Sequence, residues 1–262
     1  MRLDNYLVEN DYFDTRNKAQ IAIKNNNVFV NNKCINKNSY IVNSNDEVKI
    51  VGEVLKYVSK GGLKLEKAIN EFNIDLSNKI MCDIGSSTGG FSDVALQNNI
   101  KKIYAIDVGS NQMDKKIRNN KKIVLYENTD FRKIDSNILL DVYIITIDVS
   151  FISVTKLLPY IDKLNNVKEI VCLIKPQFEC GMEIASKYKG IILNKDIHKD
   201  IIERVIKEFN NINYYVNGLT YSPIRGGSGN IEYLLYLTKI DNNYKYDIDN
   251  IIRDGFKNKK EI

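Results

Sequence analysis

Four ionisable side chains have the types and positions that acid–base chemistry requires. They are Lys64, Asp148, Lys175 and Glu232. Asp148 and Lys175 lie at the ends of apolar runs that predict strands, and the carboxyl ends of parallel strands open on one crevice. Two lysine ammonium groups in one pocket repel each other, which favours the neutral amine of a general base. We expect Lys175 to be a base that activates a hydroxyl group, with Lys64 and Asp148 tuning it and Glu232 orienting the pair.

The same residues fit a simpler alternative, in which two surface lysines pair with nearby carboxylates. Structural ion-pair networks contain the same side chains as catalytic sites. Spacing alone therefore does not decide between the two interpretations. A ribose hydroxyl is a poor nucleophile that needs a base, so the catalytic interpretation favours a ribose hydroxyl over a nucleobase or a small molecule as the reacting group.

A glycine-rich turn joins the first predicted strand of this region to a helix. Its residues are Asp83, Ile84, Gly85, Ser86, Ser87, Thr88, Gly89, Gly90 and Phe91. Small residues let the backbone approach a ligand closely, and free N–H groups at a helix start attract an anionic group. The glycine spacing differs from the G-x-G-x-x-G of dinucleotide sites. It favours a cofactor with a cationic amino acid part, such as a methionine sulfonium, and Asp83 would lie near its ammonium group.

Further aspartates follow the next predicted strands. Asp107 ends the second strand, where an acid would accept hydrogen bonds from the ribose hydroxyls of the cofactor. Asp130 follows the third strand, where it would accept from an adenine amino group, and Asp148 would also border the cofactor. Turn glycines and strand-end aspartates occur in many α/β proteins, but three acids after three successive strands favour the cofactor interpretation.

Alternating strands and helices must position these residues. Strands are expected at 80–83, 102–108, 123–127, 142–148 and 169–174, with helices that include 89–97 and 153–164. This pattern predicts an α/β fold with a Rossmann-like, mainly parallel sheet. Two later runs, 214–219 and 231–238, leave no room for a crossover helix, so we expect an antiparallel pair at the sheet's edge.

A composition break near Gly52 divides the chain. Residues 1–51 predict a small α+β domain, with two helices, a hairpin that turns at 31–32 and a last strand at 47–51. Thr15 is the expected N-cap of the second helix. Residues 52–57 predict a linker, 58–240 the α/β domain, and 241–262 a polar, basic tail that is helical or partly disordered.

Composition excludes several other classes of protein. The chain of 262 residues is 44% hydrophobic and 27% charged, as soluble globular proteins are, and its net charge of +5 favours an anionic partner only mildly. Four cysteines without C-x-x-C spacing and a single histidine, His198, give little support to a metal site. No apolar run reaches the length of a membrane span and the start is not a signal peptide. We therefore expect a cytoplasmic protein without a membrane partner or a metal.

Six segments, in order, resemble one known family over nearly the whole chain. They are 58–65, 83–91, 107–109, 148–153, 175–179 and 226–233. They are similar to the TlyA family of ribosomal RNA 2′-O-methyltransferases, also labelled haemolysin A, whose catalytic domain is of the FtsJ type. The resemblance implies S-adenosylmethionine as cofactor and a Lys-Asp-Lys-Glu tetrad at Lys64, Asp148, Lys175 and Glu232. It also implies methylation of cytidine 2′-hydroxyls in 16S and 23S rRNA, or in 23S alone, within ribosomal subunits.

The resemblance further implies that residues 1–51 are an S4-type RNA-binding domain. The expected RNA-binding residues are Arg2, Arg16, Lys18 and Lys24. Three of them, at 16, 18 and 24, would form one positive face, although a solvated helix face is the alternative. The chain departs from the family at 190–192, which reads Gly-Ile-Ile in place of Gly-Val-Val, and at 56–58, which lacks Arg and Trp. These departures leave substrate choice and interdomain coupling open.

Two other functions stay as alternatives. A non-catalytic RNA-binding factor for ribosome assembly could use the same fold, but the four tetrad residues and the glycine-rich turn argue against it. A membrane-active haemolysin would need a long apolar span or a strongly amphipathic basic helix, and neither is evident in the sequence.

Overall fold

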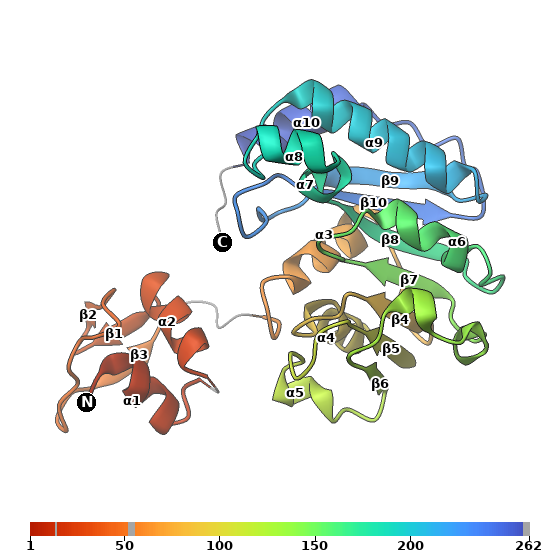
Figure 1. The fold of residues 1–262 in the computed structure, drawn as a ribbon. Coiled ribbons are helices and arrows are strands. Elements are labelled where there is room, and N and C mark those ends of the chain that lie inside the picture. The colour runs from red at the N-terminus through yellow and green to blue at the C-terminus, as the bar shows by residue number, and fades with distance from the viewer. Residues whose placement is uncertain (14, 52–55, 259–262) are drawn as a thin grey trace. The chain divides into compact units, whose positions relative to one another are not determined.

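The computed structural model describes residues 1–13, 15–51 and 56–258. The chain divides into two compact units, Met1–Lys56 and Tyr57–Ile262 (Figure 1). Of the linker predicted at 52–57, residues 52–55 lie outside the described part. Within the described ranges, no helix combines the length and apolar composition needed to cross a bilayer.

The first unit is a small α+β domain of two helices and a three-stranded antiparallel sheet. Its elements are α1 (Leu3–Glu9), α2 (Arg16–Lys24), β1 (Val28–Val30), β2 (Lys33–Cys34) and β3 (Val48–Ile50). The sheet has the order β2-β1-β3. Asn31 and Asn32, at the predicted turn, both have positive φ, which a tight hairpin favours. Thr15 caps α2 as expected, because its Oγ1 accepts a hydrogen bond from Lys18 N.

The second unit is built on a seven-stranded sheet in the order β6-β5-β4-β7-β8-β10-β9. The strands are β4 (Ile80–Ile84), β5 (Lys102–Ile106), β6 (Ile123–Tyr126), β7 (Ile144–Ile147), β8 (Glu169–Ile174), β9 (Tyr215–Tyr221) and β10 (Tyr233–Thr238). Strands β4 to β8 are parallel, and β10 runs antiparallel to β8 and β9. The order reverses between β4 and β7, whose carboxyl ends form a topological switch point. The predicted sheet with its antiparallel edge pair is confirmed.

Helices cover both faces of this sheet, so its strands are apolar on both sides (Figure 1). One core contains α3 (Gly62–Phe72), α4 (Gly90–Gln97) and α5 (Lys115–Arg118), with strand residues such as Met81. The other contains α6 (Leu158–Ile161), α9 (Lys195–Asn210) and α10 (Ile248–Lys257), with the alternate residue Cys82. The connections carry α7 (Pro176–Glu179), α8 (Met182–Lys187) and the 3₁₀ turns η1 (Phe131–Lys133) and η2 (Ser136–Leu139).

Some predicted boundaries are wrong. The helix expected at 153–164 is divided into the 3₁₀ turn η3 (Val154–Leu157) and α6. Pro159 has no N–H to continue the α-helical hydrogen bonds, so the α-helix begins only beside it. Strand β5 ends at Ile106 instead of 108, because the chain turns where the Asp107 carboxylate accepts from Gly109 N at 2.7 Å.

The carboxyl-terminal segment, predicted as a polar tail, contains helix α10 and belongs to the second unit. The helix packs against α9 and β9, and its Ile252 is buried. Arg225 donates hydrogen bonds to the carbonyls of Phe256 and Asn258 at the end of the helix. The polar composition of this segment therefore conceals one buried face.

The segment before α3 and the start of α4 approach each other closely at Gly90. A Cβ atom on this glycine would lie 2.4 Å from Ser59 Oγ and 2.8 Å from Gly62 N. Because the Gly62 contact is to backbone, a side chain at this position fits only if α3, which carries Lys64, moves.

Gly90→Ala is therefore expected to lower the free energy of unfolding by about 1–3 kcal/mol, as overpacking does. Gly227→Ala is the matched control, because among the described residues no atom beyond its chain neighbours lies within 4 Å of its Cβ position. The control should change stability by less than about 1 kcal/mol. Denaturant titration followed by circular dichroism measures both, and equal stability of the two variants would contradict the close approach.

Candidate active site

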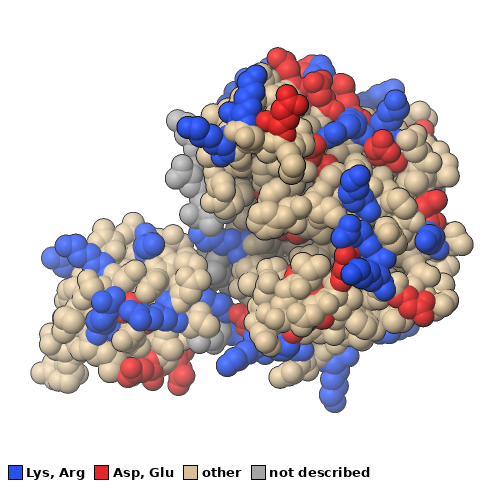
Figure 2. All heavy atoms as spheres, viewed as in Figure 1, with Lys and Arg blue, Asp and Glu red and all other residues tan. Residues whose placement is uncertain are grey.

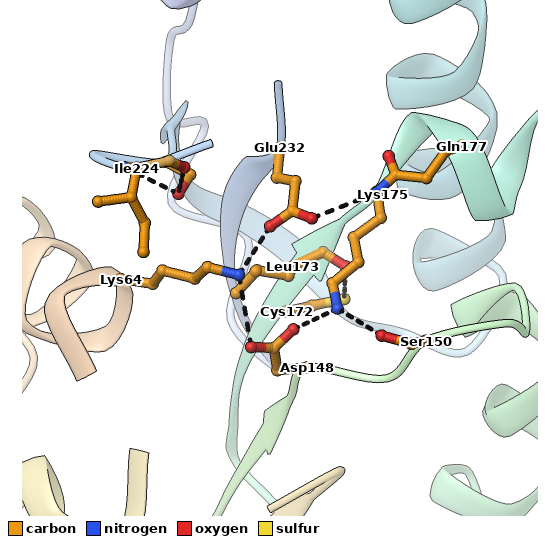
Figure 3. A network of polar contacts seen from close by, with 10 residues as sticks. Lys64, Asp148, Ser150, Cys172, Leu173, Lys175, Gln177, Ile224 and Glu232 are labelled. Carbon is orange, nitrogen blue, oxygen red and sulfur yellow. Dashed lines mark hydrogen bonds and ion pairs between the residues drawn. The ribbon is translucent and has the colours of Figure 1, made fainter. Parts of the chain in front are cut away.

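The four predicted catalytic residues meet at the carboxyl edge of the parallel strands (Figure 3). They are Lys64 on α3, Asp148 directly after β7, Lys175 directly after β8 and Glu232 directly before β10. Strand β10 runs antiparallel to β8 and pairs Tyr233 with Ile174, so its start lies beside the end of β8. This register places a residue from the end of the chain next to two strand-end residues from its middle.

Asp148 links the two lysines. Lys175 Nζ lies 2.6 Å from Asp148 Oδ1, and Lys64 Nζ lies 3.6 Å from Asp148 Oδ2. Lys64 Nζ also donates to Glu232 Oε2 at 2.7 Å. Lys175 Nζ has Ser150 Oγ as a further acceptor at 3.1 Å. Glu232 therefore contacts Lys64, while Asp148 holds both amines.

Burial and ion pairing act in opposite directions on these groups. Burial lowers the pKa of Lys64, but attraction to Asp148 and Glu232 outweighs it and raises that pKa above the usual value. Burial raises the pKa of Asp148, and the two ammonium groups outweigh this effect and lower the pKa. At neutral pH, Lys64 is therefore a fixed cation and Asp148 a fixed anion.

A cavity of about 610 Å³ opens beside the tetrad, at the carboxyl ends of β4, β5 and β7. Its size is typical of small-molecule sites. Five predicted cofactor residues line it: Gly85, Ser87, Asp107, Asp130 and Asp148. Because Asp148 also holds both lysines, cavity and tetrad share one carboxylate. In the described part of the chain, no three His, Cys, Asp or Glu side chains are grouped to hold a metal ion.

The glycine-rich loop packs tightly at the floor of this cavity. Gly85 has a φ of +82°, and a Cβ atom there would lie 2.7 Å from the main-chain oxygen of Asp148. Asp107 Oδ2 accepts from Ser87 N at 2.8 Å, while its Oδ1 accepts from Gly109 N. Asp107 thus ties the loops after β4 and β5 together, and its carboxylate keeps lone pairs for hydroxyl donors in the cavity.

Asp83 lies outside the cavity lining, in contrast to the expectation from its place in the loop. Its carboxylate is buried and accepts from Ser92 Oγ at 2.7 Å and Thr146 Oγ1 at 2.9 Å. Burial raises the pKa of Asp83 to about 6, against the hydroxyl hydrogen bonds that lower it. The structure thus places Asp83 where it joins β4, α4 and β7 instead of at the cavity surface.

Asp130 lines the cavity as a partner of Arg132. Arg132 Nε donates to Asp130 Oδ1 at 3.0 Å and Nη2 donates to Oδ2 at 2.7 Å, and these hydrogen bonds hold the pKa of Asp130 below its usual value. The other predicted loop residues shape the turn and the start of α4 without lining the cavity: Ser86, Thr88, Gly89, Gly90 and Phe91.

Three residues of the site were missed by sequence reasoning. Ser150 accepts from Lys175, and Gln177 Nε2 donates to Glu232 Oε1 at 3.2 Å. Phe151 lines the cavity with its side chain 92% exposed and its backbone at a φ of 64°, which is strained for an aromatic residue. Each lies two or three residues after Asp148 or Lys175, so proximity to a tetrad member was the available signal.

In the first unit, the Asp4 carboxylate binds two arginine side chains, Arg2 and Arg16. This buried carboxylate accepts from Arg2 Nε at 3.1 Å, Arg16 Nε at 2.9 Å and Gln20 Nε2 at 2.9 Å. The Arg2 guanidinium holds the pKa of Asp4 well below its usual range. Figure 2 shows Lys and Arg side chains over part of the visible face of this unit and acidic side chains at another edge.

The three basic residues of α2 project at different angles around the helix. Successive residues of an α-helix are about 100° apart, so Lys18 projects about 200° and Lys24 about 80° from Arg16. Arg16 instead lies beside Arg2, because both bind Asp4. Among the predicted RNA-binding residues, Arg2 and Arg16 therefore lie side by side. Around the helix axis, Lys24 is closer to Arg16 than Lys18 is.

Comparison with known proteins covers both units. Residues 57–239 match the FtsJ-like methyltransferase family, and residues 1–48 match the S4 domain. A Bacillus subtilis protein provisionally described as the rRNA methyltransferase YqxC is 44% identical over 240 residues. The matched region is 90% of this chain and 85% of that relative.

Two further likenesses extend over nearly the whole chain. The 23S rRNA (cytidine-2′-O)-methyltransferase TlyA of Campylobacter jejuni is 37% identical over 258 residues, 91% of this chain and 100% of that protein. A solved structure from Streptococcus thermophilus, provisionally described as a hemolysin, has a TM-score of 0.76 and 37% identity and covers 98% of this chain and 96% of its own. The chain therefore belongs to the FtsJ-like methyltransferase family, in the group that joins this catalytic domain to an amino-terminal S4 domain and includes TlyA.

Proposed function

We propose that this protein transfers a methyl group from S-adenosylmethionine to a cytidine 2′-hydroxyl in 16S rRNA, 23S rRNA or both. One observation carries the proposal: Asp148 borders the cavity and binds both lysines, so a methyl donor in the cavity would lie beside a lysine base. The name of the Campylobacter jejuni relative supports the same substrate class. Ribosomal subunits in the cytoplasm are the proposed partners.

The groups that line the cavity support S-adenosylmethionine as its ligand. When bound there, the sulfonium supplies an electrophilic methyl group. Gly85 and Ser87 would let the main chain approach the amino acid part, and Asp107 would accept from the ribose hydroxyls. Asp130 would receive the adenine amino group beside its Arg132 partner. Asp83 supports this loop from inside.

Lys175 is the proposed base that takes the proton of the 2′-hydroxyl. Lys64 lies between two carboxylates and stays cationic, whereas Lys175 has Asp148 and the neutral Ser150 hydroxyl as partners. Asp148 orients the Lys175 amine, and Glu232 fixes Lys64. A positioned base of this kind accelerates transfer by about 100- to 10,000-fold.

Phe151 offers an aromatic surface for the target base. Its exposed side chain lies beside the cavity, and its ring centre is 5.1 Å from that of Phe178. Unpaired bases stack on such side chains, and an enzyme that acts on a nucleotide in folded RNA needs the nucleotide turned outward. In the first unit, Arg2 and Arg16 are the proposed phosphate contacts, supplemented by Lys24 and Lys18.

Lys175→Ala is expected to lower the rate of methyl transfer by about 100-fold or more, because it removes the base. Labelled S-adenosylmethionine and purified 30S and 50S subunits measure the transfer, and the label should map to a ribose 2′-oxygen. Lys163→Ala is the control, because Lys163 is an exposed lysine just after the end of α6. No transfer by the parent protein, despite cofactor binding, would favour the assembly-factor alternative.

Asp107→Ala is expected to weaken S-adenosylmethionine binding by about 10- to 100-fold, because charged hydrogen bonds to the cofactor and to the loop are lost. Asp141→Ala removes an exposed aspartate that pairs with Lys102 and should leave affinity unchanged. Isothermal titration calorimetry compares the three proteins. Unchanged affinity of the Asp107 variant would place the cofactor elsewhere.

Arg16→Ala is expected to weaken rRNA binding more than Lys18→Ala, although each removes one positive charge. Only Arg16 belongs to the cluster that Asp4 gathers. Loss of one phosphate contact lowers the slope of log affinity against log salt by about one. Filter binding to rRNA at several salt concentrations measures this slope, and equal effects of both variants would contradict the cluster as the contact.

A further inference from the structure

The loop that carries Glu232 is held on its amino-terminal side by Asn230. This side chain is 1% exposed and uses both ends of its amide. Its Oδ1 accepts from Ile192 N at 2.9 Å, and its Nδ2 donates to Gly190 O at 2.7 Å. Its main-chain oxygen accepts from Gly226 N at 2.9 Å, which closes a turn over the site. Asn230 therefore fixes the chain two residues before Glu232.

The same segment, 190–192, also holds Tyr233, the residue on the carboxyl-terminal side of Glu232, through the single histidine His198. His198 Nε2 lies 2.9 Å from the carbonyl oxygen of Ile192. A carbonyl oxygen only accepts, so Nε2 carries the proton and Nδ1 accepts from Tyr233 Oη at 2.6 Å. His198 is fully buried, and burial lowers its pKa, so the neutral ring that this arrangement requires persists at neutral pH.

Glu232 thus lies between two residues that are both tied to Gly190–Ile192. The space around its carboxylate is also restricted, because a Cβ atom on Gly226 would lie 2.5 Å from Glu232 Oε1. Each of its carboxylate oxygens accepts a hydrogen bond, Oε2 from Lys64 Nζ at 2.7 Å and Oε1 from Gln177 Nε2 at 3.2 Å. A small shift of the loop would lengthen the ion pair with Lys64.

We propose that Asn230 and His198 are positioning residues of the methyl transfer, which hold Glu232 against Lys64 by clamping both sides of it to the segment 190–192. The inference rests on the proposed function of the tetrad. It gives a role to the lone histidine and to the Gly-Ile-Ile segment, neither of which touches the cavity or the four ionisable groups. Both act only through Glu232.

A double-mutant cycle tests this route. Asn230→Ala should lower kcat by about 10-fold or more in the otherwise unchanged protein, with the affinities for S-adenosylmethionine and rRNA retained. In a Glu232→Gln background the same change should cost less than about 3-fold, because residues that act through one another are not additive. Asn217→Ala is the matched control: this asparagine also makes several hydrogen bonds, at the opposite end of the β9–β10 pair, and its loss should leave kcat unchanged.

Tyr233→Phe removes only the hydroxyl that contacts His198 Nδ1. It replaces Asn230→Ala in this test if Asn230→Ala does not fold. It should lower kcat in the same non-additive way. Hydrogen exchange of the backbone amides in 226–233, measured without cofactor or rRNA, should be faster in Asn230→Ala and in Tyr233→Phe but unchanged in Asn217→Ala. Additive losses, or unchanged exchange with unchanged kcat, would overturn the inference. Absence of transfer by the parent protein would instead overturn the proposed function, and the exchange experiment would still decide whether the clamp exists.

Discussion

The burial of two lysines and two carboxylates, with Asp148 at their centre, is the constraint on which the catalytic unit depends. Taking a charge out of water is costly unless an opposite charge and hydrogen bonds replace the solvent. Asp148 meets this requirement for both lysines, and Glu232 completes it for Lys64. Removal of Asp148 would leave Lys175 without its carboxylate partner, and removal of Glu232 would leave Lys64 only the longer contact with Asp148. The two carboxylates therefore balance the two amines, and the surrounding elements must keep all four in register.

The sheet supplies that register. Its strand order places the ends of β7 and β8 side by side, and the antiparallel β10 brings its own start to the same edge. The glycine-rich loop is coupled to this edge, because Gly85 packs on the main chain of Asp148. The glycine-rich loop and the four ionisable residues are thus parts of one packed structure. The close approach at Gly90 extends it to α3, which carries Lys64.

In the first unit, too, a buried carboxylate fixes the positions of two cationic side chains. Asp4 is buried beneath two half-exposed arginines and fixes their spacing. An acidic residue therefore organises the positive surface that RNA would contact, and the overall charge of the unit is a poor guide to it. Around α2, Lys24 projects about 80° from Arg16, whereas Lys18 projects to nearly the opposite side.

Local sequence patterns were sufficient to predict the main strands and one helix start of this protein. Alternating apolar runs predicted the parallel sheet and its edge pair, and Thr15 predicted a helix start, because these signals depend on local conformation. Residue types singled out the four ionisable side chains, but the choice between a catalytic tetrad and surface ion pairs rested on the family resemblance. Only the tertiary structure decided which groups meet. Lys64 and Glu232 are 168 positions apart, and the loop aspartate Asp83 turns inward because Thr146 and Ser92 lie beneath it. The direction in which a side chain points, and the partners it finds there, depend on packing between distant segments, which local sequence does not encode.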